Sequence, residues 1–263
     1  MPEQTRDFAL VGELTQGGWL TGTAPAGATG VSLDGQVLAL AQDRRFFAAF
    51  DRDAGPAALL GATFADGTTA TRSLAIAPRA WDIERVAVAA RPAGVTSAEF
   101  QRLRAAELAR IAAARALDAQ SNGWRQRFVW PVRGRISGRF GSQRIYRGSP
   151  GSYHSGTDIA TGENGTPFAA PADGVVVLAA GSPFTLEGNL LIIDHGMGLS
   201  SAFLHCAQLL VREGEAVRQG QIVGRIGMTG RATGPHLHWG LKWREARLDP
   251  ELFAARMQEV PQR

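Results

Sequence analysis

The chain has 263 residues, of which 44% are hydrophobic and 20% charged, as is ordinary for a soluble globular protein with a buried core. The net charge is +4 and all but one of the 28 basic residues are arginines, but the arginines of residues 128–150 form a local basic patch at most, so we expect no nucleic-acid partner. The single cysteine, Cys206, excludes an intrachain disulfide, and the sequence has no run of about 18 apolar residues that would predict a transmembrane segment.

Residues 1–92 are predicted to form a small β-sandwich, with an immunoglobulin-like arrangement as the expected topology. Short β runs alternate with turn residues, and Asp34-Gly35 and Asp66-Gly67 are strong hairpin signals. No cluster of catalytic side chains occurs here, so we expect this domain to position the chain or to contact a protein partner. The predicted strands are Phe8–Leu14, Trp19–Thr23, Gln36–Leu40, Phe46–Phe50, Ala57–Phe64 and Thr69–Ile76.

Residues 93–127 are predicted to contain one long helix that joins two β domains. Thr96 and Glu99 fit a capping box, and the following residues are rich in alanine, leucine, arginine and glutamate. Heptad order is weak, so we favour a helix that lies between or along the domains over a coiled-coil dimer.

Residues 128–250 are predicted to form a second all-β domain, followed by a tail at 251–263. Glycines recur throughout the stretch before Pro171 and exclude a long helix there, and loops of this kind often line a groove. The predicted strands are Val129–Val132, Gly174–Ala179, Asn189–Asp194, Ser200–Cys206, Ile222–Ile226 and His236–Leu241.

All five histidines of the chain lie in this second domain. His236 and His238 are one residue apart, and on a strand such side chains point to the same face, so both imidazoles can share one site. On an extended chain His154 and Asp158 would lie about 13 Å apart, so the chain must bend between them, and Gly156 permits the bend.

The fifth residue of this set is His205, which lies on a predicted strand. Cys206 lies on the other face of that strand, so we expect its thiol to point away from the site. A catalytic zinc ion takes three histidine or carboxylate ligands and keeps a water in its fourth position. Further histidines then remain for proton transfer or for stabilising an oxyanion. The HExxH motif is absent, and spacing alone does not decide which histidine of the HxH pair binds the metal.

The order His154-x3-Asp158, then His205, then His236-x-His238 resembles the M23 metallopeptidases, also called LytM or lysostaphin-type peptidoglycan endopeptidases. The resemblance covers about residues 128–250 and includes RISGRFGSQR, GTPFAAPADGVV, LLIIDHGMGLSSAFLH, VREGEAVRQGQIVGRIGMTGRATGPHLHWG and the LDP at 248–250. It implies a small antiparallel β metallopeptidase domain with a groove. It also implies that His154, Asp158 and His238 are the zinc ligands and that His205 and His236 are the catalytic pair.

The function implied by this resemblance is zinc-dependent hydrolysis of peptide bonds in peptidoglycan cross-links or stem peptides. One histidine of the pair would deprotonate the metal-bound water, and the other would stabilise the oxyanion. The expected location is the periplasm or the exterior, although the first residues, MPEQTRDF, show no signal-peptide pattern. The alternative is a catalytically silent cell-wall binding protein that activates other peptidoglycan hydrolases; such proteins lack some of the five residues that are present here.

Four more residues have less decided roles. His195 falls in a predicted hairpin turn, and we interpret it as structural. Tyr146 and Tyr153 both precede His154, and the resemblance implies that a tyrosine of this loop can assist at the oxyanion without deciding which one. Asn189 resembles a groove-lining position, but it also suits the start of a strand. The sequence leaves open whether residues 141–153 or the long helix cover the site.

Overall fold

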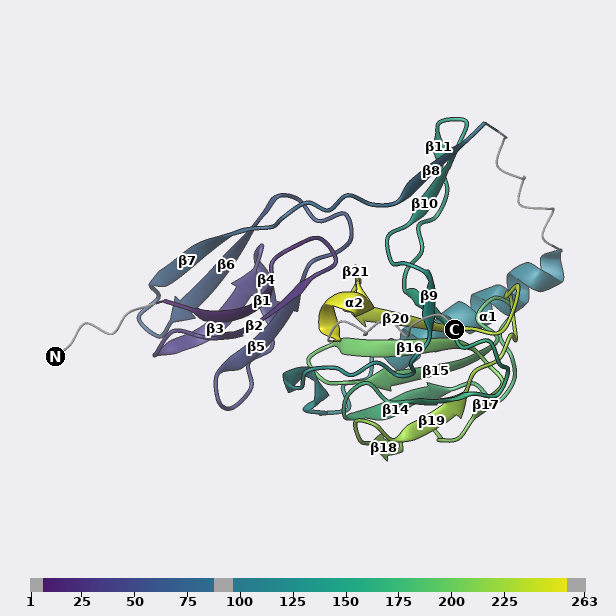
Figure 1. Cartoon of the computed structure of the whole chain (residues 1–263). Coiled ribbons are helices and arrows are strands. Elements are labelled where there is room, and N and C mark those ends of the chain that lie inside the picture. The colour runs from purple at the N-terminus through teal and green to yellow at the C-terminus, as the bar shows by residue number, and fades with distance from the viewer. Residues whose placement is uncertain (1–6, 88–96, 255–263) are drawn as a thin grey trace. The chain divides into compact units, whose positions relative to one another are not determined.

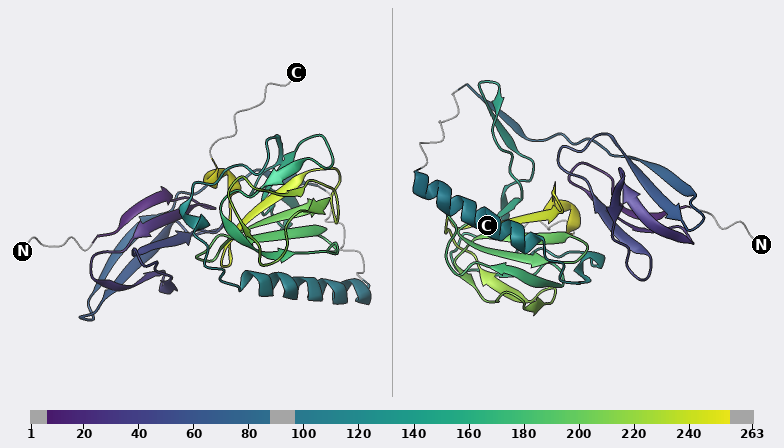
Figure 2. Two further views of the ribbon diagram at one scale, coloured as in Figure 1. Left: turned by 90° about the horizontal axis from the view of Figure 1, so that it is seen from below. Right: turned by 180° about the vertical axis from the view of Figure 1, so that it is seen from behind.

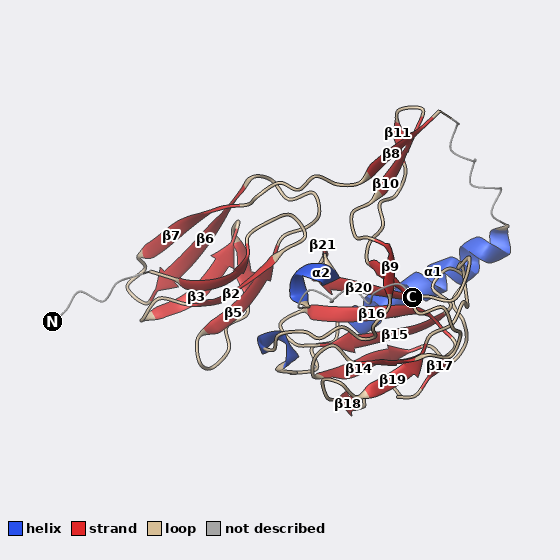
Figure 3. Cartoon of the chain, in the orientation of Figure 1, coloured by secondary structure: helices blue, strands red, loops and turns tan. Residues whose placement is uncertain are grey.

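The computed structural model describes residues 7–87 and 97–254, and the chain divides into two compact units (Figure 1). The first unit comprises residues 1–80 with 245–248, and the second comprises residues 81–244 with 249–263. Strands make up most of the regular structure in both units (Figure 3). The predicted all-β class is therefore confirmed, whereas the predicted domain limits at residues 92, 127 and 250 stay predictions.

The first unit contains two antiparallel sheets. One has the strand order β1-β2-β5 and the other the order β4-β3-β6-β7. Strands β2 and β6 have the limits predicted from the sequence, whereas β3 was not predicted. The immunoglobulin-like topology of this unit stays a prediction. The strands of these sheets are β1 (Ala9–Glu13), β2 (Trp19–Thr23), β3 (Ala28–Leu33), β4 (Gln36–Leu38), β5 (Arg45–Ala49), β6 (Ala57–Phe64) and β7 (Thr69–Ala75). The short β21 (Ala246–Leu248) belongs to neither sheet.

Alternation of side chains builds the core of the first unit. In β6 every second side chain is buried, and Leu20, Phe46 and Leu60 are fully inaccessible to solvent. Between β3 and β4, Asp34 and Gly35 both have positive φ, at 49° and 79°, as a tight two-residue hairpin turn requires. The Asp-Gly signal in the sequence therefore marks a real turn.

The second unit is built on one large sheet with the strand path β18-β14-β15-β16-β20-β12-β9, and two small sheets, β13-β19-β17 and β11-β10-β8, accompany it. Its strands are β8 (Ile83–Val86), β9 (Arg135–Gly138), β10 (Gln143–Tyr146), β11 (Ser149–Pro150), β12 (Thr157–Ala160), β13 (Pro167–Ala169), β14 (Gly174–Ala179), β15 (Asn189–Asp194), β16 (Leu199–Cys206), β17 (Gln208–Leu209), β18 (Ala216–Val217), β19 (Ile222–Arg225) and β20 (Leu237–Trp243).

Two strand predictions for this unit need correction. No strand forms at Val129–Val132, where Pro131 has no backbone N–H to donate to a ladder. The last strand begins at Leu237, so His236 precedes it and forms only an isolated bridge with Gly227. Several short strands, such as β9 and β12, were not predicted because they lie in the glycine-rich stretch, where the alternating pattern is too short to recognise.

The core of the second unit lies around β15. Leu190, Leu191, Ile192 and Ile193 are all buried, which means that both faces of this strand are covered. On one face, Leu190 and Ile192 belong to an apolar cluster that includes Ala114 of a helix. The second unit therefore uses that helix to complete its core.

This helix is α1 (Ala98–Arg115), and it lies along one face of the large sheet (Figure 2). Its N-cap is Ser97, whose side chain accepts a hydrogen bond from the backbone N–H of Phe100 at 3.1 Å, whereas the predicted cap, Thr96, lies outside the described residues. Ile111 and Ala114 pack on the sheet whereas Leu103 is 47% exposed, so the helix residues of this apolar cluster lie in its C-terminal half.

The remaining helical segments are short: the 3₁₀ turn at Gly123–Arg125 and α2 (Pro250–Phe253). Asp249 is the N-cap of α2 and accepts a hydrogen bond from the backbone N–H of Glu251 at 2.9 Å. Across residues 7–87 and 97–254, none of the helices has the length and apolarity needed to cross a membrane.

Candidate metal centre and active site

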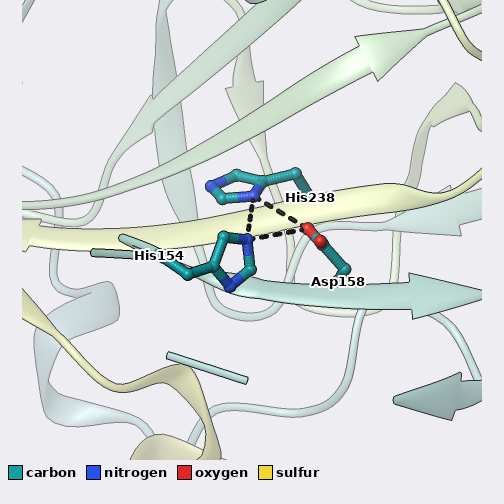
Figure 4. A group of neighbouring side chains, drawn as sticks. All are labelled: His154, Asp158 and His238. Atoms are coloured by element: carbon teal, nitrogen blue, oxygen red, sulfur yellow. Dashed lines mark hydrogen bonds and ion pairs between the residues drawn. The ribbon is translucent and has the colours of Figure 1, made fainter. Parts of the chain in front are cut away.

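Asp158 and His238 face each other across the neighbouring strands β12 and β20. They are direct partners in the antiparallel pairing of β12 with β20, an arrangement that brings opposite side chains to about 4.5–5.5 Å between Cβ atoms. The Nδ1 atom of His238 lies 2.9 Å from Oδ1 of Asp158 (Figure 4). Residues 80 positions apart in the sequence are therefore joined by sheet register.

His154 reaches the same point from the segment that precedes β12. Its backbone N–H donates to Ser142 O at 2.8 Å, and its ring Nδ1–H donates to Arg139 O at 3.0 Å. The chain then bends at Gly156, where a Cβ atom would come within 2.6 Å of Nε2 of His238. The bend that the sequence required is present, and only glycine fits it.

These three side chains converge on one point with geometry that suits a zinc ion. Nε2 of His154 lies 3.1 Å from Oδ1 of Asp158 and 3.1 Å from Nδ1 of His238. The ligand atoms of a tetrahedral zinc ion, at about 2.0–2.2 Å from the metal, lie about 3.3 Å from one another. Because the His154 proton is on Nδ1, the Nε2 lone pair points at a carboxylate and a second imidazole, which is a donor set for a cation.

The charges of the three groups are coupled even without a cation. Burial alone would raise the pKa of Asp158, but its hydrogen bonds with His154 and His238 outweigh burial and hold that pKa well below its usual range. Burial opposes protonation of His154, yet the hydrogen bond and charge of Asp158 raise its pKa. Burial dominates at His238 and lowers its pKa. Without a cation, Asp158 is therefore anionic and neutral imidazole is favoured at His238, whereas the raised pKa of His154 favours a proton on its Nε2 that a metal ion would displace on binding.

His205 and His236 stand beside this cluster. Their ring centroids are 5.0 Å apart, and Nε2 of His236 lies 3.7 Å from Oδ1 of Asp158. Each ring donates Nδ1–H to a backbone carbonyl, His205 to Thr229 at 2.9 Å and His236 to Gly234 at 2.8 Å. Both therefore keep the Nε2 lone pair free to accept a proton, and burial lowers the pKa of His205, which favours its neutral form.

The structure thus brings together all five residues singled out from the sequence. The carbonyl partners of the histidines were not predicted, because a backbone oxygen leaves no trace in the residue pattern. His205 has a positive φ of 63°, and the β15–β16 pairing shifts register near it, so the strict alternation expected for this strand stops before His205.

The other residues of interest lie apart from this cluster. His195 is fully buried, donates Nδ1–H to Asp173 O at 2.8 Å and accepts at Nε2 from Ser201 at 2.7 Å. Burial lowers the pKa of His195 to about 4 and raises that of the Cys206 thiol to about 12, so both are neutral core groups.

Among the remaining candidates, Asn189 donates its amide to Cys206 O at 2.8 Å and so supports the end of the His205 strand. Tyr153 packs edge-to-face on Phe140 with ring centroids 6.0 Å apart, and Tyr146 lies in β10. Neither arrangement decides which tyrosine assists at the oxyanion.

Comparison with known proteins identifies the domain that holds this site. Residues 152–250 match Peptidase family M23. Over 120 residues the chain is 40% identical to the peptidoglycan DD-endopeptidase ShyA of Vibrio cholerae, which covers 44% of this chain and 26% of that protein. Over 134 residues it is 37% identical to a lipoprotein NlpD/LppB homolog of Pseudomonas aeruginosa, which covers 51% of this chain and 40% of that protein.

A solved structure shares most of the architecture. The crystal structure of an M23 peptidase from Pseudomonas aeruginosa has a TM-score of 0.68 at 25% identity, and the match covers 94% of this chain and 96% of that one. By contrast, the chain spans less than half the length of the two curated relatives named above.

Proposed function

From the match of residues 152–250 to Peptidase family M23, we propose that the second unit is a zinc-dependent endopeptidase that hydrolyses peptide bonds in peptidoglycan. The observation that carries the proposal is the convergence of three ligand atoms within 4.8 Å of one another, beside two imidazoles whose Nε2 atoms can accept a proton. His154, Asp158 and His238 are the proposed ligands, and His205 and His236 the proposed catalytic residues.

The metal ion, His205 and His236 have different proposed roles in hydrolysis. The zinc ion, when bound, supplies Lewis acidity that activates a water and polarises the scissile carbonyl. His205, held neutral by burial, is suited to accept the proton of the attacking water at Nε2. His236, with Nδ1–H fixed on Gly234 O, is held in one orientation next to Asp158 and is the group that would stabilise the developing negative charge once it carries a proton.

The substrate proposal is a peptide of the bacterial cell wall, in a cross-link or a stem. ShyA is named a peptidoglycan DD-endopeptidase, and this name favours the cross-link bond between two D-centres over the other candidates. Because the proposed substrate belongs to the cell wall, the proposed location of the chain is the periplasm or the exterior. Among its described residues the first unit has no group of three His, Cys, Asp or Glu side chains that could hold a metal ion, and we propose that it positions the enzyme or contacts a protein partner.

The competing function is a silent activator of other cell-wall hydrolases. It is disfavoured because all five residues are present and lie close together, whereas a silent protein needs neither the metal ligands nor the catalytic pair.

The experiment is incubation of cross-linked and uncross-linked muropeptides with the purified protein and one equivalent of zinc, with and without chelator. We expect chelator-sensitive cleavage of the cross-linked dimer, and no cleavage by His236→Ala although that variant still binds zinc. Zinc binding without any chelator-sensitive product from several cross-link types would overturn the catalytic proposal in favour of the activator.

A further inference from the structure

His205 has a backbone conformation that its neighbours must hold in place. Its φ of 63° lies in the left-handed region, which is disfavoured for a residue with a Cβ atom and persists only where surrounding contacts determine it. Its backbone N–H donates to the carbonyl oxygen of Glu187 at 2.8 Å, and its ring donates to Thr229 O at 2.9 Å. The direction of this imidazole therefore depends on the position of Glu187.

Glu187 belongs to the β14–β15 loop, residues 180–188, and this loop is interlocked with the segment that carries Thr229. Gly188 has a φ of 67° and packs so closely that a Cβ atom there would lie 2.3 Å from Oγ1 of Thr229. On the same side, Arg231 donates its N–H to Leu186 O at 2.9 Å. The loop thus supplies one hydrogen-bond partner of His205, Glu187, and packs against the other, Thr229.

The other side of the loop is held by charged residues of α1. The guanidinium of Arg104 binds the Glu187 carboxylate with two hydrogen bonds, of 2.6 and 2.7 Å, and the two side chains are 19% and 15% exposed. Glu107, one turn later, accepts from both the N–H and the hydroxyl of Thr185 at 2.6 Å, and also from Arg104 at 3.1 Å. A bidentate, partly buried pair inside a network is the kind of ion pair that fixes geometry.

Packing alone does not explain these contacts. The apolar contact of α1 with the sheet lies at Ile111 and Ala114, in the C-terminal half, whereas Leu103 beside the ion pair is 47% exposed. The N-terminal half of the helix is therefore attached to the loop through the partly buried ion pair and hydrogen bonds of Arg104 and Glu107. This half also lies outside residues 152–250, the part of the chain that matches the peptidase family.

We propose that Arg104 and Glu107 of helix α1 are positioning residues for the reaction, because they hold the β14–β15 loop so that the Glu187 carbonyl fixes the backbone of His205. The inference rests on the proposed peptidase function for its kinetic consequence, but the clamp itself is a property of the fold. A helix that precedes the family domain in sequence thus completes the catalytic machinery of that domain.

The first test compares Arg104→Ala with Arg115→Ala in the full chain. Arg115 lies at the last turn of the same helix and contacts Ser200 Oγ at 3.3 Å, so its loss perturbs docking of the helix at the far end. We expect Arg104→Ala to lower kcat about 10- to 100-fold, with KM within twofold and one zinc still bound, since displaced supporting groups cost this much. Arg115→Ala should stay within twofold of wild type; an equal loss in both variants would overturn the proposal.

The second test uses amide hydrogen exchange and needs no activity. In Arg104→Ala, exchange at the His205 N–H should become about tenfold faster, while the amides of β15 keep their protection. Unchanged exchange at His205 would refute the clamp. If the wild type cleaves no muropeptide, the proposed function fails, whereas this readout still decides the inference.

The third test is a double-mutant cycle with Glu187→Ala, which keeps the backbone carbonyl. If the two side chains act as one clamp, the double variant loses no more kcat than either single variant. Losses that multiply would show two independent roles and contradict the proposal.

Discussion

The ring Nδ1–H of His154 donates to the backbone carbonyl oxygen of Arg139 at 3.0 Å. This contact fixes the tautomer, because a carbonyl can only accept, and it aims the Nε2 lone pair at Asp158 and His238. His205 and His236 each donate their ring Nδ1–H to a backbone carbonyl oxygen in the same way. A backbone acceptor survives every side-chain substitution at its own position, so the fold fixes which ring nitrogen of these three histidines donates.

Removal of a proposed ligand should abolish metal binding. His238→Ala leaves two protein ligands for a cation that needs three, so we expect the bound zinc to fall from one equivalent to a small fraction of one after dialysis, measured by elemental analysis. His236→Ala is the matched control from the same motif and should retain one equivalent. Full zinc retention in His238→Ala would rule out the ligand assignment.

Loss of a proposed catalytic histidine should lower the rate of hydrolysis without lowering the zinc content. His205→Ala removes the group suited to accept the proton of the attacking water, and such groups contribute about 10²- to 10⁴-fold to rates. We expect kcat for muropeptide cleavage to fall by that factor while zinc content is unchanged. A variant that keeps more than a tenth of the wild-type kcat would show that another residue is the base.

The sequence singled out the five residues that converge in the structure because their chemistry is carried by side chains in a recognisable order. Their assignment as metal ligands and catalytic pair stays a prediction. Trp19–Thr23 and Asn189–Asp194 were predicted with their observed limits, since β-branched and apolar runs bounded by turn residues are clear signals. The Asp34-Gly35 turn was predictable for the same reason.

The contacts that orient the site were not predictable. Arg139, Thr229 and Gly234 act through backbone oxygens, whose identity is independent of residue type. The role of Arg104 depends on a partner 83 positions away, and its place on a helix of weak apolar pattern gave no sign of it. His236 lies outside its predicted strand, because strand limits depend on pairing partners rather than on the local pattern.

A methyl group at Gly156 should disrupt the metal site. The added Cβ atom of Gly156→Ala would lie 2.6 Å from Nε2 of His238 and 2.6 Å from Trp239 O, so the ligand must shift. We expect zinc affinity to fall about tenfold or more, measured by competition with a chromophoric chelator. Gly181→Ala, where nothing lies within 4 Å of the added atom, should bind zinc as wild type does. Equal affinities in the two variants would show that the bend tolerates a side chain.

The buried imidazole of His195 should make the stability of the apoprotein depend on pH. Burial lowers its pKa to about 4 in the folded chain, against about 6.5 when unfolded, so the unfolded state binds the extra proton between these values. Folding stability should therefore fall as pH decreases from 6.5 to 4, with about 3 kcal/mol of the loss due to this residue.

The matched variant for this effect is His195→Gln, which cannot be protonated. It should be less stable than wild type at pH 7, because the hydrogen bonds to Asp173 and Ser201 are altered, but the difference should shrink as pH falls towards 4. The free energies of unfolding of both proteins, measured by denaturant titration in the presence of a metal chelator at pH 7, 5.5 and 4, give this difference. Other titrating groups, including His154, His205 and His238, act in both proteins and largely cancel in the comparison. A difference that stays constant with pH would show that His195 titrates alike in the folded and unfolded chains.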